Sequence, residues 1–394
     1  MSLAVETIGE LDALEQLTPS WDALARAHAE PMSSPAWMLA WWRHLAPAEA
    51  ELRAIAVHEG KELIGIAPFY VRRPRHRGDT VVYRLLAGEI STSVVPLAVP
   101  GREWEVARAL AAELARARPA PDMVALEPAP LAGPWPLALR EHWPAPVRPF
   151  VVGHDLQSAP VVLLAGSTFE QWLAARKGKF RASLRRLQRM FEQEGGASRL
   201  ASAGSLREDV AAFARLHGDR WRERGHSRLA ALGEGLEAML LDAGLALQDG
   251  APVDAAGGER FRLRMLEIAG ETVCADLALA AGGQIVGFNS GWDERYSRLS
   301  PAQLAILHGI EHGFACGDER LQLGWGGQAY KQRFADGDEP IVWNLLLPAR
   351  SRLALTLARN GPLLAGARLR GAGKRLLPER QLDRLRPLLD RLPR

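Results

Sequence analysis

Cysteine is scarce in this chain. Only Cys274 and Cys316 occur among 394 residues, and they lack the spacing of a zinc knuckle or of a disulfide framework. No apolar run approaches the ~20 residues that a membrane-spanning helix needs. The first residues also lack the basic start and apolar middle of a signal peptide. We therefore expect a reduced, cytoplasmic protein that holds no metal.

The chain also lacks a nucleophile elbow and a phosphate-binding glycine loop. Its composition, 47% hydrophobic and 24% charged, is typical of a soluble globular protein. A length of 394 residues exceeds the usual size of a single hydrophobic core. These features favour two domains. Evidence for a catalytic activity must therefore come from shorter motifs.

Charge is distributed unevenly. Residues 349–394 contain twelve Lys and Arg against three Asp and Glu, a net charge of +9, while the whole chain carries +3. The remainder is therefore acidic. A basic tail on an acidic body suggests docking to an anionic surface, whether a membrane, a nucleic acid or an acidic partner. An Arg- and Leu-rich helix packed on its own body is the alternative interpretation.

Two segments look like copies of one hairpin. Residues 54–65 and 277–287 each have an apolar strand, a tight turn with Gly, two aliphatic residues and a final Gly. The repeat indicates two related halves, joined through the Pro-rich residues 128–149. We predict domains at residues 1–159 and 160–348 and a helical tail at 349–394. In the second half, helices are expected at 177–189, 205–224 and 301–316, a helical turn at 330–334, and strands at 262–268, 273–280, 284–293, 321–323 and 341–347.

The most informative motifs lie between residues 300 and 331. Ser300 and Pro301 follow an apolar strand and predict the start of a helix, with Ser as the cap and Pro in the first turn. The free N–H groups of such a helix can bind a diphosphate, although an ordinary capped helix has the same pattern. A second strand is followed by Gly326, Tyr330 and Lys331.

The ordered set of motifs resembles the GCN5-related N-acetyltransferase (GNAT) superfamily. More narrowly, it resembles the BioF2-like or CelD-like acetyltransferases, whose tandem architecture is shared with the FemAB peptidyltransferases. The resemblance covers about residues 160–348 well and the first half in outline. It rests on the basic helix 181–189, Leu216-His217-Gly218-Asp219-Arg220-Trp221, Arg224-Gly225, Ser300-Pro301, Gly317 and Gly326-x-x-x-Tyr330-Lys331.

The resemblance implies an α+β fold. Tandem GNAT-like domains would have mixed, mostly antiparallel sheets flanked by helices, with a basic helical tail. The chain departs from the general pattern in two places. Residues 298–303 do not fit the superfamily's phosphate loop, and Gln322, Gly327 and Gln328 stand where relatives often have acids. A carboxylate base at the Tyr-Lys motif is therefore not expected.

The implied activity is direct transfer of an acyl group from acetyl-CoA or another acyl-CoA to an amine or hydroxyl. The acceptor would be polar, such as a sugar or a polysaccharide precursor. The first half is expected to be degenerate, because nothing in it matches the Tyr-Lys motif. By the same resemblance, the residues expected to contact the acyl donor are Phe288, Asn289, Arg295, Arg298, Ser300, Ala302 and Gln303.

Acyl transfer needs a base for the nucleophile and an acid for the departing thiolate. Tyr330 is the candidate acid, and Lys331 would hold an acceptor phosphate or carboxylate. Asp276, Glu267 and His217 are candidate bases. Each has a structural alternative: a Tyr that closes a turn, a solvated Lys, outward-facing acids on strands, and a packed core His. Acceptor contacts are expected at Trp221, Trp292 and Gln328, although most Trp residues are core.

Two other functions remain open. A FemAB-type transferase would use aminoacyl-tRNA, which the basic helix 177–189 could contact through phosphates. That helix also has apolar residues at a packing spacing, so a structural helix with a solvated basic face is the alternative. A non-catalytic accessory protein of polysaccharide biosynthesis would keep the fold and lose the chemistry. The expected partners are a saccharide or other small acceptor and, through the basic tail, a membrane surface.

Overall fold

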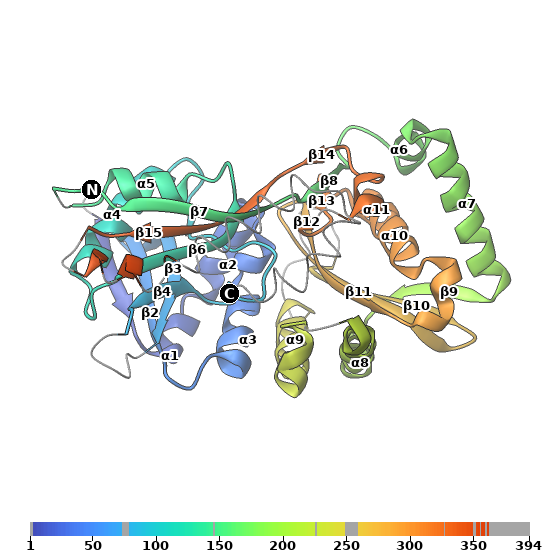
Figure 1. Ribbon diagram of the computed structural model, residues 1–394, viewed down its shortest axis with the longest axis horizontal. Helices are drawn as coiled ribbons and strands as arrows, with labels where there is room; N and C mark the ends of the chain where they lie inside the picture. Colours follow the sequence, from blue (N-terminus) through green and yellow to red (C-terminus); the bar gives the residue numbers. More distant parts are fainter. Residues whose placement is uncertain are drawn as a thin grey trace.

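The computed structural model describes residues 3–72, 79–144, 146–224, 227–248, 259–326 and 328–349, with a few positions between 352 and 361. The side chains of residues 221–224 are not among those described. The predicted tail at 349–394 therefore lies almost entirely outside the described residues. Two bodies lie side by side, each built around one sheet (Figure 1).

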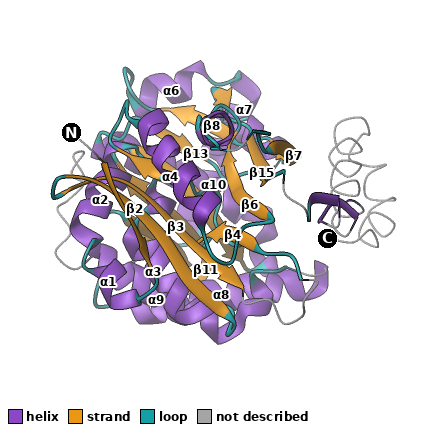
Figure 2. Ribbon diagram, turned by 90° about the vertical axis from the view of Figure 1, so that its left-hand side faces the viewer, coloured by secondary structure: helices purple, strands orange, loops and turns teal. Residues whose placement is uncertain are grey.

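Among the described residues, the first sheet has eight strands and is mostly antiparallel. Helices α2 and α3 cover one face, and α4 and α5 cover the other (Figures 1 and 2). Strand β3 is buried along almost its whole length, as expected for a strand covered on both faces. The strand order is β1 (Leu3–Ile8), β2 (Ala50–Glu59), β3 (Glu62–Arg72), β4 (Val82–Leu85), β6 (Met123–Pro130), β15 (Ile341–Leu347) and β7 (Phe150–Gln157), with β5 (Leu97–Ala98) paired to β3. The helices are α1 (Leu11–Glu15), α2 (Thr18–Ala27), η1 (Pro31–Ser33), α3 (Pro35–Leu45), α4 (Glu103–Arg116) and α5 (Trp135–Glu141).

The second sheet has seven strands, and its only parallel pair among the described strands is β12 with β13. Helices α6, α7 and α10 lie on one face, and α8 and α9 lie on the other (Figure 1). The strand order is β14 (Gly337–Asp338), β8 (Pro160–Leu163), β13 (Arg320–Gln322), β12 (Gln284–Trp292), β11 (Glu271–Ala281), β10 (Phe261–Ile268) and β9 (Gly196–Leu200). The helices are α6 (Phe169–Ala175), α7 (Gly178–Gln193), α8 (Leu206–Arg224), η2 (Ala230–Leu232), α9 (Gly233–Gln248), η3 (Glu294–Leu299), α10 (Pro301–Cys316) and α11 (Ala329–Gln332).

Helix α7 shows how the pattern of residues sets the packing. Phe180, Leu184, Leu187 and Phe191 recur every three or four residues and are all buried. The basic residues between them face outward. The first two apolar side chains pack beside α10 and β13, and the last two pack near the start of α10. Helix α7 therefore belongs to the core of the second body, as its apolar spacing predicted.

Both predicted hairpins are present, as β2–β3 and β11–β12. Two other predictions are wrong. Residues 341–347 form a strand, but β15 lies between β6 and β7 in the first sheet and does not complete the second. Residues 128–149 are not the inter-domain connection, because they contain the end of β6 and helix α5, and the chain leaves the first sheet only after β7.

The two bodies share one hydrophobic core cluster, with buried residues from both sides. Trp37 of α3 meets Phe288 of β12 edge to face, with ring centroids 5.0 Å apart. Arg260, only 3% exposed, binds both carboxylate oxygens of Asp22 at 2.9 Å. The bodies are therefore packed into one unit. Within the described part of the chain, no helix has the length and apolar character required to cross a bilayer.

Candidate active site

The site lies where β12 and β13 separate. The two strands pair only over Gln284–Val286, after which β13 ends at Gln322 and β12 continues to Trp292. The register of β12 against β11 shifts around Phe288, which marks a bulge. Residues 287–290 are partly exposed, although β12 is an interior strand. We call this opening, lined by Gly287–Ser290 on one side and residues 323–326 and 328–331 on the other, the splay.

Two glycines allow the backbones to pass closely at the base of the splay. A β-carbon on Gly287 would lie 3.3 Å from the Gln322 carbonyl oxygen, and one on Gly324 would lie 3.1 Å from the Gly287 carbonyl oxygen. Gly324 also has φ +73°, which strongly favours glycine. The close approach therefore favours glycine at both positions, and most strongly at Gly324.

Asp276 lies on the face of the sheet that carries α7 and α10. It is opposite Arg264 of β10 and Ser290 of β12 in the register of the strands. Burial raises the pKa of Asp276 to about 6, although the charges of Arg264 and Lys331 oppose the shift. Its side chain is only partly buried. The carboxyl group is thus largely enclosed by protein but still open on one side, as a base that meets a substrate requires.

Lys331 approaches the splay from α11. Its Nζ lies 3.7 Å from the position of a β-carbon on Gly324. Burial lowers the pKa of Lys331 to about 8, although the Asp276 carboxylate acts in the opposite direction. The two groups are therefore near enough to influence each other's charge. Lys331 remains mostly protonated at neutral pH and provides a cation beside the acid.

Tyr330 is the third member of this group. It is partly buried against the cluster that contains Phe180 and Phe334. Burial raises the pKa of its phenol, and the Asp276 carboxylate raises it further. The phenol therefore keeps its proton at neutral pH. This is the state that a proton donor requires.

Trp292 and Arg220 lie near the end of β12. The guanidinium carbon of Arg220 is 4.8 Å from the Trp292 ring centroid, within cation–π distance. Arg220 also lowers the pKa of Tyr330, which places it within electrostatic range of the phenol. Of the other predicted acceptor contacts, Gln328 is exposed on the loop before α11. Trp221 belongs to α8, but its side chain is not among those described.

His217 is packed rather than open. It is 1% exposed, stacks on Phe213, and has Nδ1 3.3 Å from the Ser290 carbonyl oxygen and Nε2 3.3 Å from Ser227 Oγ. Burial lowers its pKa. The ring connects α8 to β12, so its position favours the packed alternative over a catalytic base.

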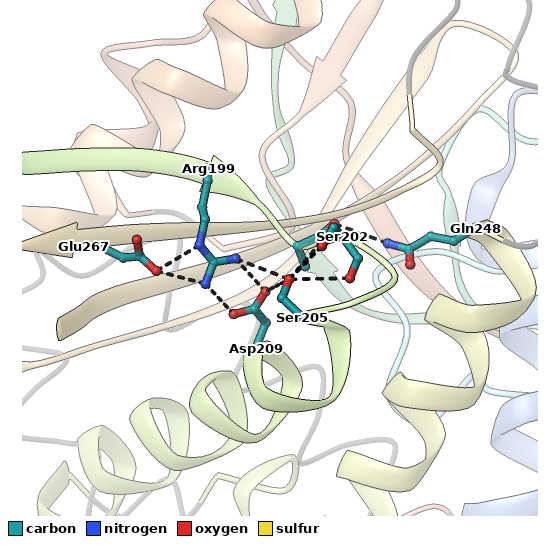
Figure 3. A network of polar contacts seen from close by, with 7 residues as sticks. Arg199, Ser202, Ser205, Asp209, Gln248 and Glu267 are labelled. Carbon is teal, nitrogen blue, oxygen red and sulfur yellow. Dashed lines mark hydrogen bonds and ion pairs between the residues drawn. The ribbon is translucent and has the colours of Figure 1, made fainter. Parts of the chain in front are cut away.

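Glu267, another candidate base, belongs to a polar network with Arg199 and with Asp209 of α8 (Figure 3). Its carboxylate accepts a hydrogen bond from Arg199 at 2.9 Å. Arg199 also binds both oxygens of Asp209 at 2.7 Å, and Ser205 donates to the same carboxylate at 2.7 Å. The network fixes the first turn of α8 to β9 and β10. Glu267 is therefore a structural anion and not part of the splay.

The start of α10 is where the sequence placed it, with Ser300 at the N-cap and Pro301 in the first turn. Ser300 has a left-handed backbone with φ +49°, and its side chain caps nothing. Its carbonyl oxygen accepts from the N–H of Gln303 at 2.9 Å and of Leu304 at 3.3 Å. Ala302 and Gln303 are partly exposed. An anion at this helix start would therefore meet chiefly the Ala302 N–H and the helix dipole.

The two predicted flanking cations are already paired. Arg295 binds Asp293 and Glu271, and Arg298 binds both carboxylate oxygens of Glu194. Both arginines keep more than half of their side chains exposed, so these pairs can rearrange.

Two residues of β12 that were predicted to contact the acyl donor have side chains that make other contacts. The Phe288 ring packs on Trp37 of the first body. Asn289 Oδ1 accepts from the Ser290 N–H at 3.1 Å. Contacts between the acyl donor and these two residues would therefore involve their backbone atoms.

Sequence reasoning missed two residues at the splay. Arg264 faces Asp276 only because of the register between β10 and β11, which no local motif reveals. Thr92 comes from the first body, and its hydroxyl donates to the Gly287 carbonyl oxygen at 2.8 Å. The first body thus closes one side of the splay. The run Ser91-Thr92-Ser93 in an otherwise apolar stretch was the available signal.

Residues 178–332 match the family model described as the acetyltransferase (GNAT) domain. The matched region includes the splay, Asp276, Tyr330 and Lys331. The search of curated proteins found no match. The domain match supports an acyltransferase of GNAT type.

Solved structures resemble the chain over most of its length. FemX covers 86% of this chain and 96% of its own, with a TM-score of 0.57 and 10% identity. The C-terminal domain (DUF2156) of a putative lysylphosphatidylglycerol synthetase from Agrobacterium fabrum covers 89% and 97%, with a TM-score of 0.54 and 12% identity. A conserved protein of unknown function from Bacteroides thetaiotaomicron VPI-5482 covers 88% and 100%, with a TM-score of 0.53 and 9% identity. At these identities the likeness concerns the fold alone. The predicted class, two mostly antiparallel sheets flanked by helices, is confirmed.

Proposed function

We propose that this protein is an acyl-CoA-dependent acyltransferase of the BioF2-like or CelD-like type. It would transfer an acyl group directly to an amine or hydroxyl of a polar acceptor, such as a sugar or a polysaccharide precursor. The observation that carries the proposal is the grouping of Asp276, Tyr330 and Lys331 at the splay, inside the region that matches the GNAT domain. Acid, base and cation thus lie within electrostatic range of one another.

The residues at the splay divide the chemistry between them. The acceptor's nitrogen or oxygen attacks the thioester carbon, and its proton passes to the Asp276 carboxylate directly or through one water. The carbon–sulfur bond breaks, and the Tyr330 phenol returns a proton to the departing thiolate. The Lys331 ammonium attracts an anionic group of the acceptor and helps to keep Asp276 ionised. The two proton transfers balance over one turnover.

The donor has two regions to contact. The open edge of β12 at Gly287–Ser290 offers backbone groups to an extended arm that contains amides, in the manner of an added strand. The start of α10 offers the Ala302 N–H and the helix dipole to a diphosphate. No buried basic pocket is needed for this arrangement. It therefore survives the departures of residues 298–303 from the phosphate-loop pattern.

Thermal unfolding with and without acetyl-CoA and longer acyl-CoAs tests the proposal. A ligand at 100 times its dissociation constant should stabilise the protein by about 2.7 kcal/mol. Ala302→Glu places a carboxylate beside the proposed diphosphate and suits a helix N-terminus, so the fold should tolerate it. Ala302→Gln has the same shape without the charge and is the matched control.

We expect Ala302→Glu to weaken acyl-CoA binding at least tenfold and Ala302→Gln to weaken it much less. Equal effects of the two variants would contradict the proposal that the diphosphate binds at the start of α10. No stabilisation of the wild-type protein by any acyl-CoA would contradict the proposed donor.

One observation favours the FemAB-type alternative with aminoacyl-tRNA. Lys179, Arg185 and Arg189 lie on the exposed face of α7, and none of them is in an ion pair with another described residue. Such a face would bind RNA through its phosphates, with affinity that falls steeply as salt rises. Co-purifying RNA and a steep salt dependence would support this alternative. An accessory protein would bind neither ligand, and Tyr330→Phe would leave its cellular function intact.

The remaining parts of the proposal concern location. A cytoplasmic enzyme that acts on envelope or extracellular polysaccharide precursors would work near a membrane face. The basic residues 349–394 would provide peripheral contact with anionic lipids there.

A further inference from the structure

Three potential metal ligands meet at the end of α10 that is remote from Ser300. His312 and Cys316 are four residues apart, so they share one face of the helix. Glu259 lies just before β10 and reaches the same place. One ligand atom from each residue lies within 4.8 Å of the other two. No local motif indicates this group, because Cys274 and Cys316 have no metal-ligand spacing and Glu259 is distant along the chain.

Two of the three distances between the ligand atoms match those of a tetrahedral site. His312 Nε2 is 3.4 Å from Cys316 Sγ and 3.3 Å from a Glu259 carboxylate oxygen. Tetrahedral zinc, with bonds of about 2.3 Å to sulfur and 2.0–2.1 Å to nitrogen and oxygen, separates its ligands by about 3.5 Å for S···N and about 3.3 Å for N···O. Two edges of the tetrahedron are therefore already formed. Glu259 is 54% exposed and is free to adjust the third.

A single hydrogen bond from His312 cannot join all three groups. The same His312 nitrogen faces both the sulfur and the carboxylate. A single N–H points along one direction and cannot donate well to both. A cation placed between the three atoms would bind all of them at once.

The surrounding charges are compatible with a cation. Arg262 of β10 binds Asp318 through distances of 2.6 and 3.3 Å, with both side chains almost fully buried. Its positive charge is thus compensated. Arg264, further along β10, is in hydrogen-bond contact with Ser198 and faces Asp276. Glu311 adds a negative charge on α10 itself.

We propose that Glu259, His312 and Cys316 form a binding site for a borderline divalent cation, of which Zn²⁺ is the best match. A nitrogen, a thiolate and a carboxylate are the ligand types that zinc prefers. Three protein ligands leave a fourth position for water, so the metal should exchange and a chelator should remove it. The site would join the chain entering β10 to the last turn of α10. It lies apart from the splay and does not depend on the acyltransferase proposal.

The test uses the full-length protein, treated with a chelator and kept reduced with a phosphine. Titration with Co²⁺ should produce a thiolate-to-metal charge-transfer band that saturates at one equivalent, and Zn²⁺ should displace the cobalt. The band should disappear in Cys316→Ser. It should persist in Cys274→Ala, which removes the other cysteine and is the control.

His312→Ala and Glu259→Gln extend the test. Both should weaken Zn²⁺ binding at least tenfold, and Glu259→Gln changes an exposed side chain that the fold does not need. A band that survives Cys316→Ser, or affinities unchanged in these two variants, would overturn the proposal. So would the absence of any bound metal at micromolar Zn²⁺.

Discussion

At the scale of single residues, Asp276 is the most informative group. Burial raises its pKa from 3.8 to about 6, so folding favours its protonated form. The associated stability is complete below about pH 4 and is lost as the pH rises through 6. Above pH 6 the protein therefore holds a carboxylate that costs it stability. This is typical of a group kept for chemistry rather than for the fold.

Asp276→Asn tests both aspects. We expect turnover to fall 10²- to 10⁴-fold, since a general base contributes about that much. The free energy of unfolding of the variant, relative to wild type, should rise by about 3 kcal/mol between pH 4 and pH 7.5. Urea unfolding across this pH range measures the difference. A wild-type rate without an acid limb near pH 6, or a constant stability difference, would contradict the role of Asp276.

Tyr330→Phe tests the proton donor. We expect turnover to fall about 10²-fold, because the thiolate would then leave without a proton, while acyl-CoA affinity stays within twofold of wild type. Acyl donors with a more acidic thiol should recover part of the lost rate. Parallel loss of turnover and affinity would instead indicate that the ring supports the binding site.

The sequence predicted these residues unevenly, for physical reasons. Tyr330 and Lys331 belong to a short motif after a strand, and local sequence is enough to find them. Asp276 was one of several acids on strands, and only the pairing of three strands shows that it faces Arg264 while Glu267 faces Arg199. His217 has the right chemistry but a packed position, and packing is a property of the fold.

At the scale of elements, the network at the first turn of α8 shows charged residues that hold a helix against a sheet. Asp209 is 4% exposed and Arg199 is 38% exposed, so the pair is neither fully buried nor free in solvent. It joins α8 to β9, while Glu267 extends it to β10. Leu206 and Val210 add apolar contacts at the start of the same helix.

The variants Asp209→Asn and Glu267→Gln measure how much each of the two acids contributes to the free energy of unfolding. We expect Asp209→Asn to reduce the free energy of unfolding by about 1–3 kcal/mol, since it weakens a charged, mostly buried contact. Glu267→Gln, at a more exposed position, should cost less than about 1 kcal/mol. Turnover should stay near wild type in both variants, measured per folded protein. A large loss of turnover in Glu267→Gln would restore Glu267 as a candidate base.

Element positions were predicted more reliably than element partners. Helix α10 spans Pro301–Cys316, as predicted, and ends at Gly317. Strand β15 was also recognised, but seven apolar residues do not tell which of two sheets they join. The short strands β8 and β9 have too few residues for a clear pattern. Their pairing depends on neighbours from distant parts of the chain.

At the scale of the whole molecule, the last described strand completes the first sheet. Strand β15 pairs with β6 on one side and β7 on the other. Without it, β7 has no partner among the described strands, and β6 presents an open edge. The second body is thus inserted between β7 and β15. The predicted boundary between residues 159 and 160 falls between the two sheets, but the predicted second domain, residues 160–348, includes β15, which belongs to the first sheet.

This topology predicts the behaviour of fragments. We expect residues 1–159 alone to show no cooperative thermal unfolding. The fragment lacks β15, an interior strand of the first sheet. It also exposes apolar surface that Phe288 and α9 cover in the whole chain. Residues 1–349, which keep β15 and omit the tail, are the control and should unfold in one transition that includes both bodies. Joining residues 341–349 to the fragment through a flexible linker should recover part of the cooperativity. A sharp transition for residues 1–159 alone, at the temperature of the control, would show that the first body folds without β15 and would favour the sequence-based boundaries.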